Sequence, residues 1–353
     1  MKYYFAPMEG ITLYPLRNIH KEMFGEGVDK YFTPFVTAAK TYHFKKREQR
    51  DILPEYSRAF VDYTTEVVPQ IMGNQAETII WAAKKMNELG YKEVNINLGC
   101  PVATVVNRHK GSGLLEDPDK LDQMLYEIFD AREKEHLPFD ISLKTRLGMS
   151  DEAEATRLME IYAKYPISEL IIHARIREDY YKGAVRLDAF NKAVDTYKAA
   201  GGAAPICYNG DIGSINMTSK QAEFANQDAD RLNGQHDGAG LDLAMMPASI
   251  ANDSFNLMIG RGLLTNPALV RELRGGARLS SQELSTYLDR LYEGYEEYIP
   301  EDRNVIFKML EHWAFIHVHF KDCDKYLKAI RKSRSKGEYK AAVRDIFSSC
   351  EFI

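Results

Sequence analysis

The amino-acid sequence predicts an α/β fold, a (β/α)₈ TIM barrel, followed by a C-terminal all-helical domain. Eight short apolar runs recur through the first three quarters of the chain, separated by segments with helical spacing. The runs are rich in Val, Ile and Phe, as in parallel strands covered on both faces, and comprise residues 3–7, 30–35, 67–72, 93–98, 140–144, 169–173, 205–209 and 255–259. Their number and spacing match an eight-stranded barrel.

Helical signals fill the connections between these runs. Residues 75–89 place Ile79, Ala83 and Met86 on one stripe and end at Gly90. Residues 117–135 open with Asp-Pro, a favoured pair for the first positions of a helix. A third helix is expected over residues 151–164, with Ser150 as its N-cap.

The runner-up fold is a doubly wound parallel sheet. That fold would place a glycine-rich phosphate loop directly after its first strand. The chain has Met8-Glu9-Gly10-Ile11 there, which contains no such loop. The barrel is therefore the preferred prediction.

The pattern changes after Pro267, where strands are no longer expected. We predict a barrel domain over residues 1–267 and a helical domain over residues 268–353. Its long helical stretches cover residues 281–298, 305–319 and 323–332. Residues 216–252, rich in Gly, Asn and Asp, are expected to form an inserted, partly ordered loop on the active-site face, with a helical piece at 219–225.

Composition limits the classes of function. No apolar run approaches the roughly 20 residues that span a bilayer, and no signal peptide is apparent, so we expect a cytoplasmic protein. The four cysteines are scattered without metal-ligand spacing, so no metal site is expected.

The charge distribution is uneven. The net charge of −5 argues against binding of nucleic acid by the whole surface. Residues 321–344, however, carry nine Lys/Arg against three Asp/Glu, and residues 40–50 form a second basic stretch. Such runs are more often solvated helix faces, but two of them favour a polyanionic partner.

Polar or special residues cluster at the ends of the predicted strands, where barrel enzymes carry their active sites. These residues are Met8, Glu9, Gln70, Asn97, Cys100, Lys144, His173, Asn209, Gly210, Asp211, Gly260 and Arg261. Each alone has an ordinary structural explanation, but their recurrence at the same end of the strands predicts a site.

Cys100 lies on a predicted tight turn between Gly99 and Pro101. A thiol held at a strand end is a candidate nucleophile or general acid. A lone cysteine is more often a small buried hydrophobic residue, so the motif needs the surrounding residues to support it.

The loops after the seventh and eighth strands predict a phosphate site. They carry Asn209-Gly210-Asp211 and Gly260-Arg261-Gly262. Barrels often bind phosphate between these two loops, where glycines let backbone N–H groups approach an anion and an arginine supplies a cation. A phosphorylated cofactor is the economical interpretation.

These motifs, in this order, resemble the tRNA-dihydrouridine synthase family over nearly the whole chain. The matching segments are Ala6-Pro7-Met8-Glu9-Gly10, Pro69-Gln70-Ile71-Met72-Gly73, Asn97-Leu98-Gly99-Cys100-Pro101, Lys144-Thr145-Arg146-Leu147-Gly148, His173-Ala174-Arg175, Asn209-Gly210-Asp211-Ile212 and Gly260-Arg261-Gly262. Two departures are the length of residues 216–252 and Ala174, where glycine is common.

The resemblance implies an FMN-dependent enzyme that uses NADPH to reduce uridines of tRNA to 5,6-dihydrouridine. It places Pro7, Met8 and Glu9 along the isoalloxazine ring, and Gln70 and Lys144 at the polar edge of that ring. It assigns the FMN phosphate to Asn209, Gly210, Asp211, Gly260 and Arg261, with His173 nearby. Hydride would pass from flavin N5 to uracil C6, and Cys100 would give the proton to C5. Asn97 could hydrogen-bond the uracil edge, and Arg331, Lys332 and Arg334 would contact tRNA.

Two other functions stay open. One is a flavin-dependent barrel that acts on a free pyrimidine such as dihydroorotate, which would have no need of a basic helical domain. The other is an RNA-binding protein that retains flavin without chemistry, which would need neither Cys100 nor Lys144. The sequence does not specify the tRNA position, the oligomeric state, for which a monomer is expected, or the choice of NADPH over NADH.

Overall fold

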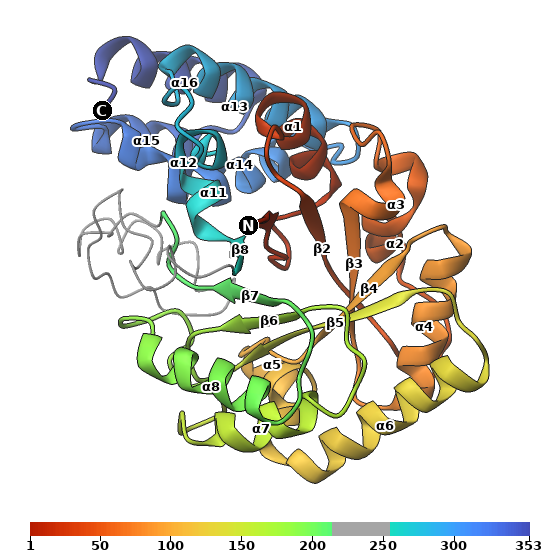
Figure 1. The fold of residues 1–353 in the computed structure, drawn as a ribbon. Coiled ribbons are helices and arrows are strands. Elements are labelled where there is room, and N and C mark those ends of the chain that lie inside the picture. The colour runs from red at the N-terminus through yellow and green to blue at the C-terminus, as the bar shows by residue number, and fades with distance from the viewer. Residues whose placement is uncertain (214–254) are drawn as a thin grey trace.

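The computed structural model describes residues 1–213 and 255–353, and it contains a closed barrel of eight parallel strands (Figure 1). Each strand pairs with the next along the chain, and β8 pairs with β1. The strands are β1 (Tyr3–Phe5), β2 (Lys30–Thr37), β3 (Val67–Met72), β4 (Glu93–Asn97), β5 (Asp140–Arg146), β6 (Leu170–His173), β7 (Ile206–Asn209) and β8 (Asn256–Ile259). The predicted barrel is confirmed. The loop predicted at 216–252 and its helical piece at 219–225 lie outside the described residues.

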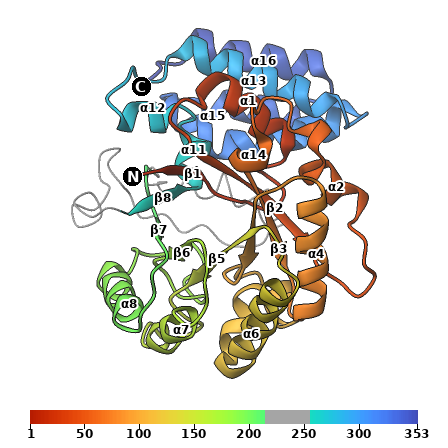
Figure 2. The same cartoon turned by 45° about the vertical axis from the view of Figure 1, so that its right-hand side comes forward.

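Helices cover the outside of the barrel (Figures 1 and 2). They are α1 (Tyr14–Phe24), α2 (Lys46–Ile52), α3 (Tyr63–Glu66), α4 (Ala76–Glu88), α5 (Ala103–Val106), α6 (Pro118–Lys134), α7 (Glu154–Tyr162) and α8 (Leu187–Ala199), with short 3₁₀ turns η1 (Pro54–Tyr56) and η2 (Gly111–Glu116). Helix α7 starts three residues later than predicted, and Ser150 is not its N-cap. The Glu154 carboxylate instead accepts the backbone N–H groups of Met149, Ser150 and Asp151, which fixes a turn before the helix.

Alternation along the strands separates two cores. A small cluster consists of Tyr4, Ala6, Phe32, Val68, Ile171, Cys207 and Met258. A much larger cluster includes Tyr3 and Phe5, the neighbours of Tyr4 in β1, together with residues of the surrounding helices. Because successive side chains of a strand point to opposite faces, one set fills the barrel and the other joins strands to helices.

The chain after β8 is helical, as predicted. It contains α11 (Arg261–Thr265), α12 (Leu269–Leu273), α13 (Ser281–Glu296), α14 (Asp302–Ile316), the 3₁₀ turn η3 (His317–His319), α15 (Asp324–Lys332) and α16 (Lys336–Ser349). Helix α13 packs on α1 and α14 packs on α11, so this helical region is attached to the barrel side that carries β1 and β8 (Figure 2). The domain boundary predicted at residue 267 falls between α11 and α12 and stays a prediction.

The sequence analysis missed α16. Its buried residues Tyr339, Ala342, Val343 and Ile346 have regular helical spacing, so the signal was present. The Ser335 side chain accepts a hydrogen bond from the N–H of Glu338 and begins the helix. Among the helices that the structure describes, none is long and apolar enough to cross a bilayer.

Candidate active site

A chain of amides crosses the interior of the barrel from β3 to β5. The Nδ2 group of Asn97 donates to Oε1 of Gln70 at 2.7 Å, and Nε2 of Gln70 donates to Oδ1 of Asn95 at 2.8 Å. Asn95 in turn donates to the Ser142 hydroxyl at 2.9 Å. All four residues are buried, so the network satisfies polar groups that would otherwise be costly and fixes the orientation of Asn97.

Asn97 also holds the turn that carries Cys100. Its Oδ1 accepts the backbone N–H of Cys100 at 2.9 Å and that of Gly99 at 3.1 Å. The Cys100 carbonyl accepts both the N–H and the hydroxyl of Ser112, at 3.1 and 2.8 Å. The backbone of Cys100 is therefore held from the end of β4 and from η2, and the residue remains half-buried rather than packed in the core.

Gly111 makes close packing over Cys100 possible. Its φ is +57°, and a Cβ built on it would lie 2.9 Å from the Cβ of Cys100. A larger residue would strain the backbone and displace the thiol. The sequence analysis did not single out this glycine, although it begins a Gly-Ser-Gly segment.

Burial raises the pKa of the Cys100 thiol, with a smaller raising effect from Glu9. A hydrogen bond from the Val102 backbone, and then the cations of Arg146 and Lys144, act in the opposite direction but do not overcome burial. The thiol therefore stays protonated at neutral pH, as a proton donor requires.

Lys144 lies on β5 next to β4, in register with Asn97, and its ammonium reaches across to β7. Nζ donates to Oδ1 of Asn209 at 2.9 Å, and Asn209 donates to the Met258 carbonyl at 2.8 Å. Burial by surrounding atoms, and then the nearby Arg146, lower the pKa of Lys144 to about 8. Part of the Lys144 side chain is still accessible to solvent, at the end of the barrel.

Four cations converge on His173. Burial, and then the charges of Arg146, Lys144, Arg175 and Arg261, hold the pKa of this imidazole well below its usual range. His173 is thus neutral, and the region around it is strongly positive. Such a cluster suits an anionic ligand.

Arg146 is a site residue that the sequence analysis quoted in a motif but assigned no role. It is almost fully buried, and its guanidinium donates to the carbonyls of Gly99, Ile176 and Tyr180 at 2.8, 3.0 and 2.9 Å. It therefore ties the Cys100 turn to the loop after β6. The alternation Lys144-Thr145-Arg146, which points both cations to the same face, was the available signal.

Asp211 is held by two arginines. Its Oδ1 accepts from Arg175 at 2.9 Å and from Arg261 at 2.5 Å, and its Oδ2 accepts a second bond from Arg175. These ion pairs lower the pKa of Asp211 despite its burial. Tyr181 lies beside this cluster, with the guanidinium carbons of Arg146 and Arg261 at 5.4 and 5.6 Å from its ring centroid.

The loop after β1 carries the predicted Pro7, Met8 and Glu9. Glu9 forms an ion pair with the exposed Arg47 of α2, and Pro7 and Met8 are half-buried. Burial raises the pKa of Glu9 even with this partner. One residue of the basic stretch at 40–50 is thus linked to the barrel end.

The predicted tRNA contacts lie away from these residues. Arg331, Lys332 and Arg334 line a separate cavity in the helical region, and none of the barrel residues that the structure describes lines it. Other members of the basic run are already paired within the helical region and its C-terminus: Lys321 with Glu351, Lys336 with Glu296 and Lys340 with Asp289.

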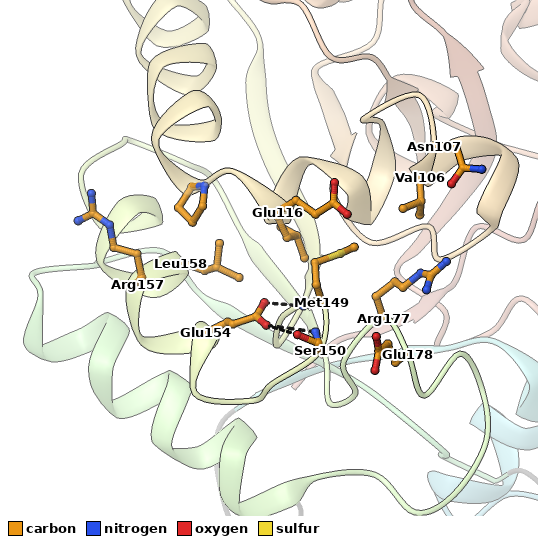
Figure 3. Close-up of a pocket in the computed structure, with 12 residues that line it drawn as sticks. Val106, Asn107, Glu116, Met149, Ser150, Glu154, Arg157, Leu158, Arg177 and Glu178 are labelled. Atoms are coloured by element: carbon orange, nitrogen blue, oxygen red, sulfur yellow. Dashed lines mark hydrogen bonds between the residues drawn. The ribbon is translucent and has the colours of Figure 1, made fainter.

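A second cavity of about 560 Å³ opens between the loops that follow β4, β5 and β6 (Figure 3). Its lining mixes Arg157 and Arg177 with Glu116, Glu154 and Glu178. None of the predicted site residues lines this cavity. No group of His, Cys, Asp and Glu in the described ranges has the arrangement of a metal site.

Comparison with known proteins gives a consistent result. The family model described as "Dihydrouridine synthase (Dus)" matches residues 4–229. "Probable tRNA-dihydrouridine synthase 2" of Bacillus subtilis is 28% identical over 347 residues, which cover 96% of this chain and 92% of that protein. "tRNA-dihydrouridine synthase B" of Pasteurella multocida is 28% identical, covering 76% and 67% of the two chains. "tRNA-dihydrouridine(16) synthase" of Cupriavidus necator is 27% identical, covering 82% and 81%.

Proposed function

Because the chain belongs to the dihydrouridine synthase family, we propose that it reduces uridines of tRNA to 5,6-dihydrouridine, with FMN as prosthetic group and NADPH as reductant. The observation that carries this proposal is the position of Cys100. Its protonated thiol is held on the turn after β4, within electrostatic reach of Lys144 and Arg146. We further propose that it acts as a monomer in the cytoplasm.

The residues present fit a flavin phosphate. Four cations surround the neutral His173, and one carboxylate, Asp211, is paired with two of them. Arg261 would bind the phosphate, and Asn209, Gly210 and Gly260 would line its loop. Asp211 differs from the expectation: a carboxylate repels a phosphate, so we assign it the role of orienting Arg175 and Arg261.

The chemistry that FMN would supply here, with NADPH as reductant, is transfer of a hydride to C6 of the uracil ring. Lys144 and Gln70 would hold the polar edge of the ring system, and Pro7, Met8 and Glu9 would line it. An ammonium at this place also stabilises negative charge in a site shielded from water.

Cys100 would complete the reduction. Addition of hydride at C6 leaves enolate character at C5 of uracil, which then takes the proton from Sγ. Asn97 would fix the Cys100 turn through its Oδ1 and retains a second Nδ2–H beyond the one given to Gln70, which is available for the edge of the base.

The target base is stacked within folded tRNA, so it must leave the stack to reach the barrel end. The helical region would position the tRNA through backbone phosphates, with Arg331, Lys332 and Arg334 as contacts. A free pyrimidine would need none of these residues.

The test is a reaction of the FMN-loaded protein with NADPH and unmodified tRNA transcripts, followed by mass spectrometry of the nucleosides. We expect dihydrouridine at a defined position. Dihydroorotate, assayed in parallel, is the control for the small-molecule alternative. Turnover of dihydroorotate without any dihydrouridine in tRNA would overturn the proposal.

A further inference from the structure

A basic cavity of about 400 Å³ lies in the helical region, apart from the barrel site. Its lining comes from the first turns of α14 and from the end of α15 with the turn that follows, two helices that pack together. The lining residues are Arg303, Ile306, Phe307, Arg331, Lys332, Ser333 and Arg334. This size lies within the roughly 300–1,000 Å³ of pockets that hold small ligands.

The described part of the cavity lining is cationic. Of the seven described residues that line it, four are cationic and none is acidic. The nearest carboxylates in sequence accept backbone N–H groups instead: Asp302 from Lys336 at 2.7 Å, and Glu338 from Arg334 at 2.8 Å. Within residues 1–213 and 255–353, no carboxylate lies at ion-pair distance from Arg303, Lys332 or Arg334.

An exposed aromatic ring forms one wall. Phe307 is 42% exposed, although its neighbours Val305, Ile306 and Met309 on α14 are buried. The guanidinium carbon of Arg303 lies 5.5 Å from the centroid of that ring. An exposed ring beside an arginine offers an apolar face for stacking together with a cation, and single-stranded nucleotides are bound by this combination.

Helix α14 connects this cavity to the barrel end. Lys308, the residue after Phe307, donates from Nζ to the Gly10 carbonyl at 2.8 Å. Gly10 belongs to the loop after β1 that carries Met8 and Glu9. A polynucleotide whose target base enters the barrel would therefore pass near α14.

We propose that this cavity binds one unstacked nucleotide of the tRNA, with its base against Phe307 and its phosphate at Arg334 and Lys332. The inference rests on the proposed function and adds a second anchored nucleotide to it, distinct from the uridine that is reduced. Phe307 supplies stacking, which does not depend on salt, whereas Arg334 and Lys332 supply phosphate contacts, which do.

The test compares Phe307→Ala and Arg334→Gln in the FMN-loaded, full-length protein. Binding of the tRNA transcript is measured across a series of salt concentrations. We expect Phe307→Ala to weaken affinity about 5-fold or more without changing the slope of log K against log[salt]. Arg334→Gln should lower the magnitude of that slope by about 1.

Two further variants make the test specific. Phe307→Trp should restore affinity, and its fluorescence should change on tRNA binding beyond the change given by Trp81 and Trp313 in the parent protein. Tyr126→Ala removes an exposed aromatic ring from α6 on the outer wall of the barrel and should leave tRNA affinity unchanged.

The outcomes separate this inference from the proposed function. Unchanged tRNA affinity in Phe307→Ala, with tRNA reduction by the parent protein intact, overturns the cavity and leaves the function standing. A parent protein that neither binds nor reduces tRNA overturns both. A raised KM for NADPH in Phe307→Ala, with tRNA affinity unchanged, would reassign the cavity to the dinucleotide.

Discussion

Replacing Cys100 by alanine should separate the two half-reactions of the proposed enzyme. The thiol is half-buried and is held by Asn97 and Ser112 through backbone groups. Those hydrogen bonds do not involve Sγ, so Cys100→Ala keeps them; it removes the proton donor together with the hydrogen bond between Sγ and the Val102 backbone. The fold and flavin binding should therefore be preserved.

The magnitude follows from the state of the thiol. Burial raises the pKa of the Cys100 thiol, so the thiol is protonated at neutral pH. Loss of a positioned general acid lowers a rate by about 10²–10⁴-fold, which corresponds to about 3–5 kcal/mol of transition-state stabilisation. Since the pKa is raised, loss of this proton should lower the parent rate only at a pH above the range in which a free thiol titrates.

The assay is single-turnover reduction of tRNA by the pre-reduced protein, with flavin reduction by NADPH measured separately. Cys100→Ala should lose the first rate and keep the second. Cys350→Ala, a half-buried cysteine in the helical region, is the matched control and should keep both. If Cys100→Ala reduces tRNA at the parent rate, Cys100 is a structural thiol and the reasoning is refuted.

Three further changes have definite expected outcomes. Arg261→Ala should weaken FMN binding by about 1.5–3 kcal/mol, the value of a hydrogen bond to a charged group, and an unchanged Kd in a flavin fluorescence titration would exclude a phosphate contact. Lys144 has a pKa of about 8, so its positive charge is present below pH 8 and is lost above it. The rate of flavin reduction by the parent protein should therefore fall as the pH rises through 8. A rate that stays constant up to pH 10 would contradict the role of the Lys144 ammonium at the flavin. Lys30 forms ion pairs with Glu93 and Glu169 at the opposite end of the barrel. Lys30→Met leaves these two carboxylates without a cation, so it should lower the free energy of unfolding in urea by about 3 kcal/mol. A decrease of less than about 0.5 kcal/mol would show that the carboxylates adapt to the loss of Lys30.

The sequence predicted the barrel well because its signals are local. Each strand is a short run of apolar residues, and the chemistry-bearing residues follow at the same end of each run. Helix bounds were less accurate where one side chain decided where the helix starts, as in α7, whose first residue Glu154 accepts backbone N–H groups of the preceding turn. Helix α16 has clear apolar spacing, but part of it lies in the basic run at 321–344. That run was interpreted as a binding surface, and the helical spacing was not used.

The sequence did not predict which side chains form ion pairs with one another. The basic run at 321–344 looked uniform, yet Lys336 and Lys340 are paired with carboxylates of α13, while Lys332 and Arg334 open onto a cavity. Phe307 gave no signal, because a single aromatic residue on a helix is normally part of the core. Only the packing of α14 against α15 reveals that its ring is exposed beside a basic wall.

Hydrogen-bond capacity explains why Arg261, rather than Arg175, suits the phosphate. A guanidinium has five N–H donors. Arg175 directs donors to the carbonyls of Lys182 and Gly183, to both oxygens of Asp211 and, at 3.4 Å, to the His173 ring, so all five are engaged. Arg261 uses one donor on Asp211 and one, at 3.4 Å, on the Tyr181 carbonyl, which leaves donors for a ligand. Asp211 therefore links a fully engaged arginine to an available one, and this pairing orients Arg261 before any anion binds.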